Sequence, residues 1–546
     1  MSEDLRWRNF FDVFEEGLQD APEQEILGQV MDLEGRYQGY SWSDLVMLAR
    51  RGQAAYRKLG LRRGDRALLA LPTGEAFFAA LLGAFREGIC VAAVAPRENL
   101  RTAVTLREVE SVRRIYGPDV IVADEGVDGC LHMAPQALLS AEPGNGDWAA
   151  PEEVQYVQFS SGSTGTPKGV VLSMNEICAN LEMMRQRLSV WGEQRGLSWL
   201  PLYHDMGLFG GFLLCTYSMV HVTLMDPTLF VRNPLLWIRQ MSERRATNTV
   251  TSPSALMATL RLLQLRPQEN LDLSSLIRVI VGAEQVTPRL VELYHQVLGP
   301  HGAPPEALLP TYGLAEATLA ATIPPLNSGL QVLDCIHRQH RLRQHQAVPS
   351  DPEDENAETW VACGSPLPGM ELKIADQDGT PLPERSIGRV FLKGPSMLRG
   401  YLLDGQYHDC LGQWLDTEDL GYLADGHLFL TGRVRDLIIK GGRNFSPERL
   451  EDLATTLDGI DRAAAFGIFD PERGTERMVV MAEVHPRWLR NEERRMQLHK
   501  QLFQELLAAD YPIDELRFVE RGNLPRTTSG KLRRQECRSL FLEAEA

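Results

Sequence analysis

The chain has 546 residues, of which 44% are hydrophobic and 24% are charged, and its formal net charge is -17 at pH 7. This composition is typical of a globular protein with about two to four domains or subdomains. The negative charge argues against a general binder of nucleic acid or of anionic membranes.

The cysteines and the N-terminus indicate a cellular compartment. The eight cysteines form no C-x-x-C pair and no Cys/His cluster with zinc spacing, so we expect reduced thiols in a cytoplasmic protein. The N-terminus has no apolar run behind a basic start, so we expect no signal peptide. The longest apolar stretch, residues 76–94, is broken by Arg86 and Glu87. It favours a buried helix followed by a strand over stable membrane insertion.

The first half of the chain alternates helical and strand patterns. Residues 41–59 predict a helix with Ser43 as its cap, because apolar residues recur at helical spacing. The elements expected next are strand 66–71, helix 75–86, strand 89–94 and later strands 198–200, 249–251 and 278–281. Such alternation predicts βαβ units and a mainly parallel sheet, and therefore the α/β class.

A glycine-rich segment, residues 160–169, lies between two apolar runs that predict strands. Its ten residues include three glycines, five hydroxyl side chains and Lys168. Glycines let backbone N–H groups converge, and hydroxyls with a lysine complete a cradle for phosphate oxygens. It is not the G-x-x-x-x-G-K-[ST] loop, because Gly169 follows the lysine. Taken alone, the segment also fits a polar surface hairpin.

The pattern changes after about residue 360. Short β-rich pieces follow, with a hairpin at 421–431 that turns at Asp425-Gly426. Beyond residue 433, strands at 463–468 and 477–484 alternate with helices at 447–457 and 491–509. This predicts a small α+β domain of roughly a hundred residues. We therefore expect an N-terminal domain over 1–433, made of αβ subdomains and a β-rich subdomain, and a C-terminal domain over 434–546.

Residues 331–358 form an irregular insertion. Its first part is rich in histidine and arginine and its second part in acidic residues. The two charge blocks favour a solvated surface segment. The arginines interleaved among His337, His340 and His345 argue against a metal site.

Four more segments carry candidate chemistry, at 198–208, 311–316, 417–436 and 524–534. Each has an ordinary structural interpretation on its own. In this order and together with 160–169, they resemble the adenylate-forming superfamily of acyl-CoA synthetases, peptide-synthetase adenylation domains and luciferases. The resemblance runs from about residue 40 to residue 534.

Within that superfamily the chain is most similar to fatty acyl-AMP ligases. The similarity rests on Pro201-Leu202-Tyr203-His204-Asp205-Met206-Gly207-Leu208, on Tyr312-Gly313-Leu314-Ala315-Glu316 and on Val361-Ala362-Cys363-Gly364. The insertion falls where that subgroup has one, which is thought to disfavour CoA by restraining the C-terminal domain. Two departures are Glu418, where glycine is usual, and Gly441-Gly442-Arg443-Asn444, where Arg-Gly-Arg-Asn is usual. The second bears on the choice between a carrier protein and CoA.

The resemblance implies ATP and Mg²⁺ as cofactors, with roles for particular residues. The glycine-rich loop would hold the phosphates, Lys168 would order that loop, Glu316 would bind magnesium, Tyr312 would stack on adenine, and Asp419 with Arg433 would hold the ribose. The expected nucleotide-binding residues are Ser161, Gly162, Ser163, Thr164, Gly165, Lys168, Gly282, Ala283, Glu284, Thr311, Tyr312, Gly313, Asp419, Arg433 and Arg435. Arg435 matches the family's hinge position.

The expected catalytic residues are Lys531, His204 and Glu316. By resemblance, Lys531 sits on a mobile C-terminal domain, and its flexible stem carries a point charge to the reacting carboxylate and α-phosphate. His204 would line the carboxylate end of the acyl channel, although a core histidine bonded to backbone is the plain alternative. Apolar lining is expected from 209–213 and 252–257.

The implied reaction joins a fatty or related carboxylic acid to AMP, and then transfers the acyl group to the phosphopantetheine thiol of a separate acyl carrier protein. A cluster of Arg487, Arg490, Arg494 and Arg495 could dock an acidic carrier, or could simply be an exposed helix face. The alternatives are an acyl-CoA synthetase, with CoA as the acceptor, and a non-catalytic nucleotide- or acyl-binding homologue. No nucleic-acid partner is expected.

Overall fold

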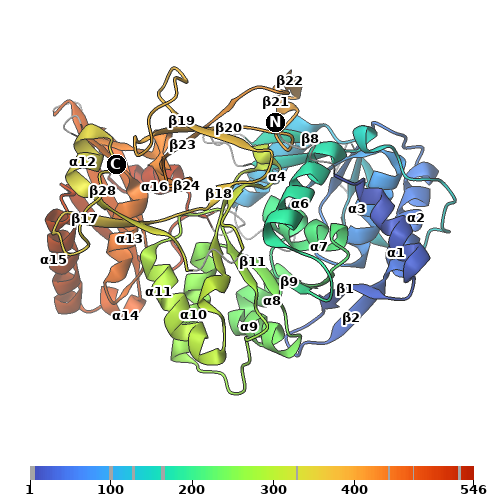
Figure 1. The fold of residues 1–546 in the computed structure, drawn as a ribbon, viewed down its shortest axis with the longest axis horizontal. Helices are drawn as coiled ribbons and strands as arrows, with labels where there is room; N and C mark the ends of the chain where they lie inside the picture. Colours follow the sequence, from blue (N-terminus) through green and yellow to red (C-terminus); the bar gives the residue numbers. More distant parts are fainter. Residues whose placement is uncertain are drawn as a thin grey trace.

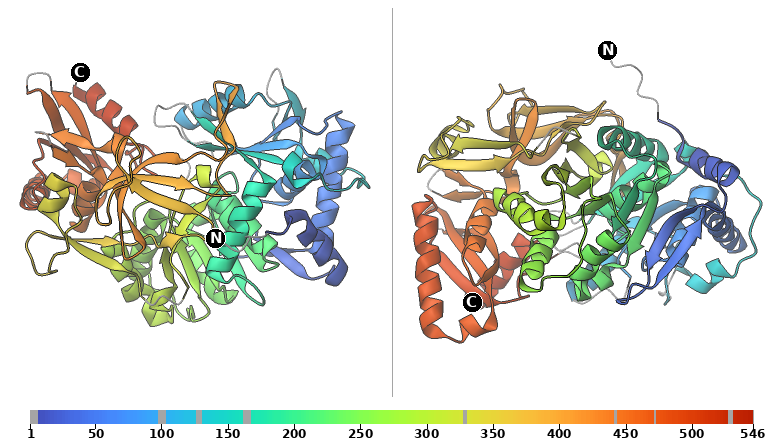
Figure 2. Two further views of the ribbon diagram at one scale, coloured as in Figure 1. Left: turned by 45° about the horizontal axis from the view of Figure 1, so that its top comes forward. Right: turned by 60° about the horizontal axis from the view of Figure 1, so that its bottom comes forward.

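The computed structural model describes residues 7–96, 103–125, 130–160, 167–326, 330–440, 443–470, 473–526 and 531–545. Figure 1 shows the N-terminal helices at one end of the molecule and the C-terminal domain at the other, and both views of Figure 2 keep this arrangement. The β-rich part lies between them along one side. The expected α/β class is confirmed, with a large N-terminal domain and a smaller C-terminal domain.

Two large sheets form the N-terminal domain. The first has the strand order β22-β21-β8-β7-β4-β3-β5-β6 and the second β13-β12-β11-β9-β10-β1-β2. The first contains β3 (Arg66–Leu69), β4 (Cys90–Ala93), β5 (Val120–Val122), β6 (Leu131–Met133), β7 (Gln155–Ser160), β8 (Lys168–Ser173), β21 (Gly400–Leu403) and β22 (Gln406–Asp409). The second contains β1 (Glu25–Val30), β2 (Tyr37–Ser41), β9 (Arg195–Ser198), β10 (His221–Met225), β11 (Asn248–Thr251), β12 (Arg278–Val281) and β13 (Leu308–Pro310).

Most neighbours in both sheets are parallel, as the alternation predicts. The helices on these sheets include α1 (Phe10–Asp20), α2 (Trp42–Lys58), α3 (Glu75–Glu87), α4 (Ala103–Tyr116), α6 (Met174–Leu188), α9 (Pro234–Glu243), α10 (Pro253–Leu265) and α11 (Pro288–Leu298). The predicted strand at 198–200 is shifted, because β9 ends at Ser198. The expected cap of α2 is also wrong: Ser41 accepts the Asp44 N–H and completes a capping box, and Ser43 lies inside the helix.

A four-stranded antiparallel sheet leads toward the C-terminal domain, in the order β19 (Glu371–Ala375), β20 (Gly388–Lys393), β23 (Leu415–Ala424) and β24 (His427–Arg433). The expected hairpin turn is confirmed: Asp425 and Gly426 connect β23 to β24, with φ of 51° and 76°. Positive φ at both central residues is what a two-residue hairpin turn requires.

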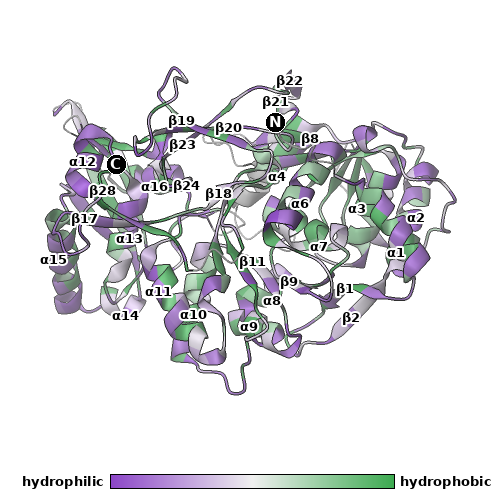
Figure 3. Cartoon of the chain, viewed as in Figure 1, coloured by the Kyte–Doolittle hydropathy of each residue, from purple (hydrophilic) through white to green (hydrophobic). Residues whose placement is uncertain are grey.

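The C-terminal domain is built on β27 (Ile460–Asp470), β28 (Thr475–Val484) and β29 (Glu515–Glu520), with α13 (Pro447–Thr456), α15 (Glu492–Ala508) and α16 (Arg534–Glu545). A short hairpin, β25 (Ile438–Lys440) and β26 (Arg443–Phe445), precedes them. Helix α15 buries only Leu498, Leu502 and Leu506, and Figure 3 colours most of this helix as hydrophilic. The predicted strands 463–468 and 477–484 fall within β27 and β28, whereas the predicted helix 447–457 exceeds α13 by one residue and the predicted helix 491–509 exceeds α15 by one residue at each end.

The insertion differs from its prediction. It forms strand β16 (Leu333–His337), helix α12 (Arg338–Gln344) and strand β17 (Ala357–Val361), and β16 pairs with β17. Arg341 and Glu358 are 6% and 3% exposed and form a salt bridge of 2.6 Å, so the opposite charges neutralise each other inside the protein. Leu342 joins the apolar core of the C-terminal domain. The insertion is therefore a packed connection between domains.

All eight cysteines are free thiols. Within the described ranges, no helix combines the length and the apolar character that crossing a bilayer requires.

Helices α2 and α3 cross at two glycines. A Cβ on Gly83 would lie 2.5 Å from backbone atoms of Gly52, and a Cβ on Gly52 would lie 2.0 Å from the Ala79 carbonyl oxygen. Since backbone is what each Cβ would meet, neither contact can be relieved by turning a side chain. The crossing therefore depends on both glycines.

We predict that Gly83→Ala lowers the stability of the N-terminal domain by about 1–3 kcal/mol, because the helices must move apart. Thermal unfolding of both proteins measures the change. Gly299→Ala is the matched control, since a Cβ there meets nothing within 4 Å. Equal melting temperatures for Gly83→Ala and the wild type would contradict the crossing as described.

Candidate active site

A cavity of about 1090 Å³ lies between the two domains. Most of the residues expected from the sequence line it: Gly282, Ala283, Glu284, Thr311, Tyr312, Gly313, Glu316, Asp419, Arg433, Arg435 and Lys531. His204 and Lys168 are not among its lining residues, although their neighbours Asp205 and Pro167 are. Ser161, Gly162, Ser163, Thr164 and Gly165 lie outside the described residues.

Asp419 is the centre of a buried polar group. The Tyr312 hydroxyl donates to its Oδ2 at 2.7 Å, and Arg433 Nε donates to its Oδ1 at 2.6 Å. Asp419 and Arg433 face each other across β23 and β24, and the register of these strands shifts directly after them. Such irregularities re-aim side chains beside functional sites. The negative charge of Asp419 raises the pKa of Arg433.

The segment after β12 presents its backbone to the same cavity. A Cβ on Gly282 would lie 2.7 Å from Thr311 Oγ1, so this close approach requires glycine. Ala283 has a φ of 73°, an uncommon conformation for a residue with a side chain. Glu284 accepts the N–H and the hydroxyl of Ser254, at 3.0 and 3.1 Å, which ties the segment to the start of α10.

Glu316 lies in the 3₁₀ turn η6 (Ala315–Ala317), where its own carbonyl accepts the Leu398 N–H at 2.7 Å. Tyr401 donates to its Oε1 at 3.1 Å, and Lys168 Nζ lies 5.9 Å from the centre of the Tyr401 ring. Burial raises the pKa of Glu316, while Tyr401, Arg433 and Lys168 oppose that rise. Sequence reasoning missed Tyr401, because only the pairing of β21 with β8 brings it here.

The surroundings of Glu316 fit a magnesium ion held mainly by a substrate. A carboxylate is the hard oxygen donor that Mg²⁺ prefers, and Mg²⁺ usually takes one or two protein carboxylates together with phosphates and water. Within the described part of the chain, no group of three or more His, Cys, Asp or Glu side chains could hold a metal by itself. Glu316 would supply one ligand, and the ion would neutralise phosphate charge.

The charge of Lys531, in the C-terminal domain, acts on His204 and Asp205. Burial and the Lys531 charge together lower the pKa of His204 to about 4. Burial raises the pKa of Asp205, and Lys531 and the Met206 N–H oppose this. Asp205 Oδ1 accepts that N–H at 2.8 Å, at the start of the π-helix η3 (Met206–Leu213). The charge of Lys531, which lines the cavity, therefore acts on Asp205, which also lines it, and on the neighbouring His204.

The apolar wall differs in part from the expected ranges. Gly210, Pro253, Ser254 and Met257 line the cavity, whereas Phe209 and Phe212 are completely buried in the core of the N-terminal domain. Other apolar residues complete the wall: Met184, Leu188, Leu214, Ile280, Leu319 and Ile323. Helix α6 contributes the first two, and no local motif marked them in the sequence.

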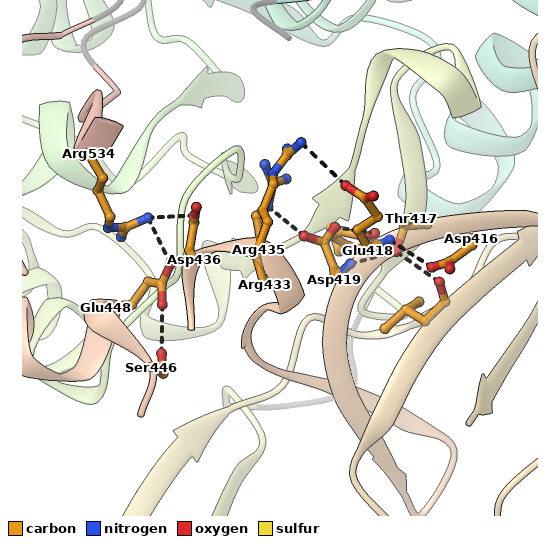
Figure 4. A network of polar contacts seen from close by, with 12 residues as sticks. Asp416, Thr417, Glu418, Asp419, Arg433, Arg435, Asp436, Ser446, Glu448 and Arg534 are labelled. Atoms are coloured by element: carbon orange, nitrogen blue, oxygen red, sulfur yellow. Dashed lines mark hydrogen bonds and ion pairs between the residues drawn. The ribbon is translucent and has the colours of Figure 1, made fainter. Parts of the chain in front are cut away.

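Arg435 pairs with Glu418 at 3.3 Å, next to the pair of Arg433 with Asp419 (Figure 4). Glu418 has a φ of 61°, the left-handed conformation that the glycine usual at this position adopts readily. The departure from the family pattern therefore keeps the backbone turn and adds a charge partner for Arg435.

The comparison with known families agrees with this geometry. A sequence profile of AMP-binding enzymes matches residues 14–402. The chain belongs to this family. It is an adenylate-forming ligase, which activates an acid through an acyl-adenylate. The matched range ends before Asp419, Arg433 and Lys531.

Individual relatives are similar to this protein over nearly the whole length of its chain. A protein of Caulobacter vibrioides named as an acyl-CoA synthetase is 30% identical, covering 91% of this chain and 89% of its own length. The medium-chain-fatty-acid–[acyl-carrier-protein] ligase JamA of Moorena producens is 28% identical, covering 88% and 86%. A structure from a study of fatty acyl-adenylate ligases from E. coli and L. pneumophila aligns over 98% of both chains, with a TM-score of 0.85 and 26% identity. The resemblance to fatty acyl-AMP ligases and acyl-CoA synthetases is confirmed.

The lowered pKa of His204 makes stability depend on pH. The unfolded state binds this proton near pH 6.5 and the folded state only near pH 4, so acidification between these values favours unfolding. We predict that His204→Gln loses less stability than the wild type between pH 6.5 and pH 4, measured by thermal unfolding. The exposed His408 offers a control variant, His408→Gln. Parallel losses in the wild type and His204→Gln would contradict the prediction.

Proposed function

We propose that this protein activates a fatty or related carboxylic acid with ATP and then transfers the acyl group to the phosphopantetheine thiol of a separate acyl carrier protein. The observation that carries the proposal is that Lys531 and Asp205 line one cavity together with Tyr312, Glu316, Asp419 and Arg433. Side chains suited to binding a nucleotide and the ammonium group of Lys531 thus line the same cavity.

In the first step, a carboxylate oxygen of the acid attacks the α-phosphorus of ATP, and the bond from that phosphorus to the pyrophosphate oxygen breaks. Two anions must approach, so fixed donors and positive charge stabilise the transition state. Lys531 would supply that charge. Asp419 would accept the ribose hydroxyls while Arg433 holds its carboxylate in place, and Tyr312 with the backbone at Gly282 would enclose the adenine.

His204 would act as a neutral group at the carboxylate end of the acid site. Because its pKa is lowered to about 4, it carries no charge near pH 7 and does not compete with Lys531 for the carboxylate. The apolar wall from α6, η3 and the segment 319–323 suits an acyl chain. These assignments, and a boundary between the domains at 433 and 434, belong to the same proposal.

The insertion supports a carrier protein over CoA as acceptor. Arg341 donates to Glu358 at 2.6 Å and to the Tyr511 hydroxyl of the C-terminal domain at 3.5 Å, and Leu342 packs in that domain's core. A charged pair this deeply buried keeps its place because separating it would leave an uncompensated charge. These contacts would restrain the rotation of the C-terminal domain. JamA, named as a carrier-protein ligase, is similar over most of its length.

The second candidate is an acyl-CoA synthetase, which the name of the Caulobacter vibrioides relative favours. The two candidates are separated by supplying either CoA or a phosphopantetheinylated carrier protein to the enzyme after adenylation. Acyl transfer to the carrier with little transfer to CoA is the expected result. Efficient formation of acyl-CoA would overturn the proposal in favour of the second candidate.

We predict that Lys531→Ala abolishes carboxylate-dependent exchange of labelled pyrophosphate into ATP and leaves ATP binding nearly intact. The reason is that the charge is needed mainly in the transition state. Exchange is measured with a panel of acids from short to long chain, and ATP binding by calorimetry. A variant that keeps most of its exchange rate would contradict the assignment of Lys531.

A second prediction concerns the insertion. We expect Leu342→Ser to raise acyl transfer to CoA relative to the wild type, because it loosens the contact of α12 with the C-terminal domain, while pyrophosphate exchange stays unchanged. Leu333→Ser is the matched control, since Leu333 is a leucine of the same insertion that is 50% exposed. If the ratio of acyl transfer to CoA and to the carrier protein is unchanged in Leu342→Ser, the insertion does not determine which acceptor the enzyme uses.

A further inference from the structure

Arg534, three residues after Lys531, makes an unusual set of contacts. Its Nη1 atom lies 2.9 Å from Asp436 Oδ2 and 3.0 Å from Glu448 Oε1, and its Nε and Nη2 atoms bind both oxygens of Glu451 at 2.7 Å. The four side chains are only 14–18% exposed. One guanidinium therefore faces three carboxylates in a largely desolvated place.

The three carboxylates belong to two segments that Arg534 joins. Asp436 ends the 3₁₀ turn η7 (Val434–Asp436), which leaves β24, whereas Glu448 and Glu451 lie on successive turns of α13. Glu448 also accepts the Ser446 hydroxyl at 2.6 Å, and Glu451 accepts the Ala465 N–H of β27 at 3.0 Å. These bonds fix the carboxylates, so Arg534 is held on rigid partners.

Figure 4 shows how this contact relates to the hinge candidate. Arg433 and Arg435 pair with Asp419 and Glu418 of the N-terminal domain, while Asp436, the next residue, pairs with Arg534. Arg435 and Asp436, which are adjacent in this turn, thus form ion pairs with residues on opposite sides of the domain junction. Through Arg534, the position of the Lys531 segment is tied directly to that turn.

The charges explain why this tie affects Lys531. Asp436, Glu448, Glu451, Arg534 and Lys531 all line the same cavity. Lys531 has a long flexible stem, and opposite charges attract each other. Arg534 binds Glu451 through two hydrogen bonds and contacts Asp436 and Glu448 once each. Without Arg534, three unpaired carboxylates would line the cavity that Lys531 also lines, and they would compete with the substrate for its ammonium group.

We propose that Arg534 is a positioning residue for Lys531: it neutralises the carboxylates of Asp436, Glu448 and Glu451 and thereby leaves the Lys531 ammonium directed at the reacting groups. The inference rests on the proposed role of Lys531 in acid activation. Arg534 itself does not touch the substrate. Its effect is therefore expected on the rate of adenylation and not on the binding of ATP, whose expected contacts at Tyr312, Asp419 and Arg433 are elsewhere.

The test measures pyrophosphate exchange in the full-length protein with the best acid from the panel. Arg534→Gln should lower kcat by roughly 100-fold, the size of effect that a misplaced catalytic group produces, while the KM for ATP stays within a few-fold of the wild type. Arg534→Lys should recover part of the rate. Arg538→Gln, one turn further along α16, is the matched control and should keep the wild-type rate.

A charge-rescue variant separates positioning from simple loss of structure. Adding Glu448→Gln and Glu451→Gln to Arg534→Gln removes two of the three competing charges, so the triple variant should exchange pyrophosphate faster than Arg534→Gln alone. Melting temperatures are measured for every variant, and if Arg534→Gln does not fold, Arg534→Lys with and without the two glutamines takes its place. No rescue by the glutamines, or a rise in KM that accounts for the whole loss, would overturn the proposal.

The proposed function and the role of Arg534 are contradicted by different results. If the wild type exchanges no pyrophosphate with any acid, the proposed function itself is wrong. If the wild type is active and Lys531→Ala is inactive, but Arg534→Gln keeps the wild-type kcat, only the role of Arg534 is wrong.

Discussion

The pair of Asp419 with Arg433 is the interaction on which the site depends. It joins the neighbouring strands β23 and β24, and Arg433 is the last residue of β24, directly before the turn η7. The same carboxylate accepts the Tyr312 hydroxyl from a segment more than 100 residues earlier in the chain. One ion pair thus joins the wall of the cavity to the point where the two domains meet.

Charge burial is the second feature that organises the molecule. Arg341 pairs with Glu358 inside the insertion and also donates to Tyr511 of the C-terminal domain, and Arg534 with its three carboxylates links the turn η7 to the Lys531 segment. Buried pairs contribute little net stability compared with apolar packing, but each has few alternative partners. Both pairs therefore serve to specify how the domains are placed, and the proposed chemistry needs that placement because Lys531 must cross the junction.

Several parts of this protein were predictable because their signals are local. The alternation at 66–94 gave the parallel strands β3 and β4 with α3 between them, and Asp425-Gly426 gave the hairpin turn of β23 and β24. The cap of α2 was misplaced by two residues, since Ser41 and Ser43 carry the same signal and only the reciprocal bond to Asp44 separates them. The insertion was misread because its charges look solvated until Arg341 and Glu358 are seen to pair.

The sequence by itself determined the family, the order of the elements and the residue types of the site, because short motifs keep their spacing in any fold that uses them. Only the tertiary structure decided that Tyr401 reaches Glu316, that α6 supplies part of the apolar wall, and that Lys531 and Asp205 line one cavity. These contacts join residues 85 or more positions apart, such as Tyr401 and Glu316. Strand pairing and domain packing bring these distant residues together, and the periodicity of the sequence does not predict such contacts.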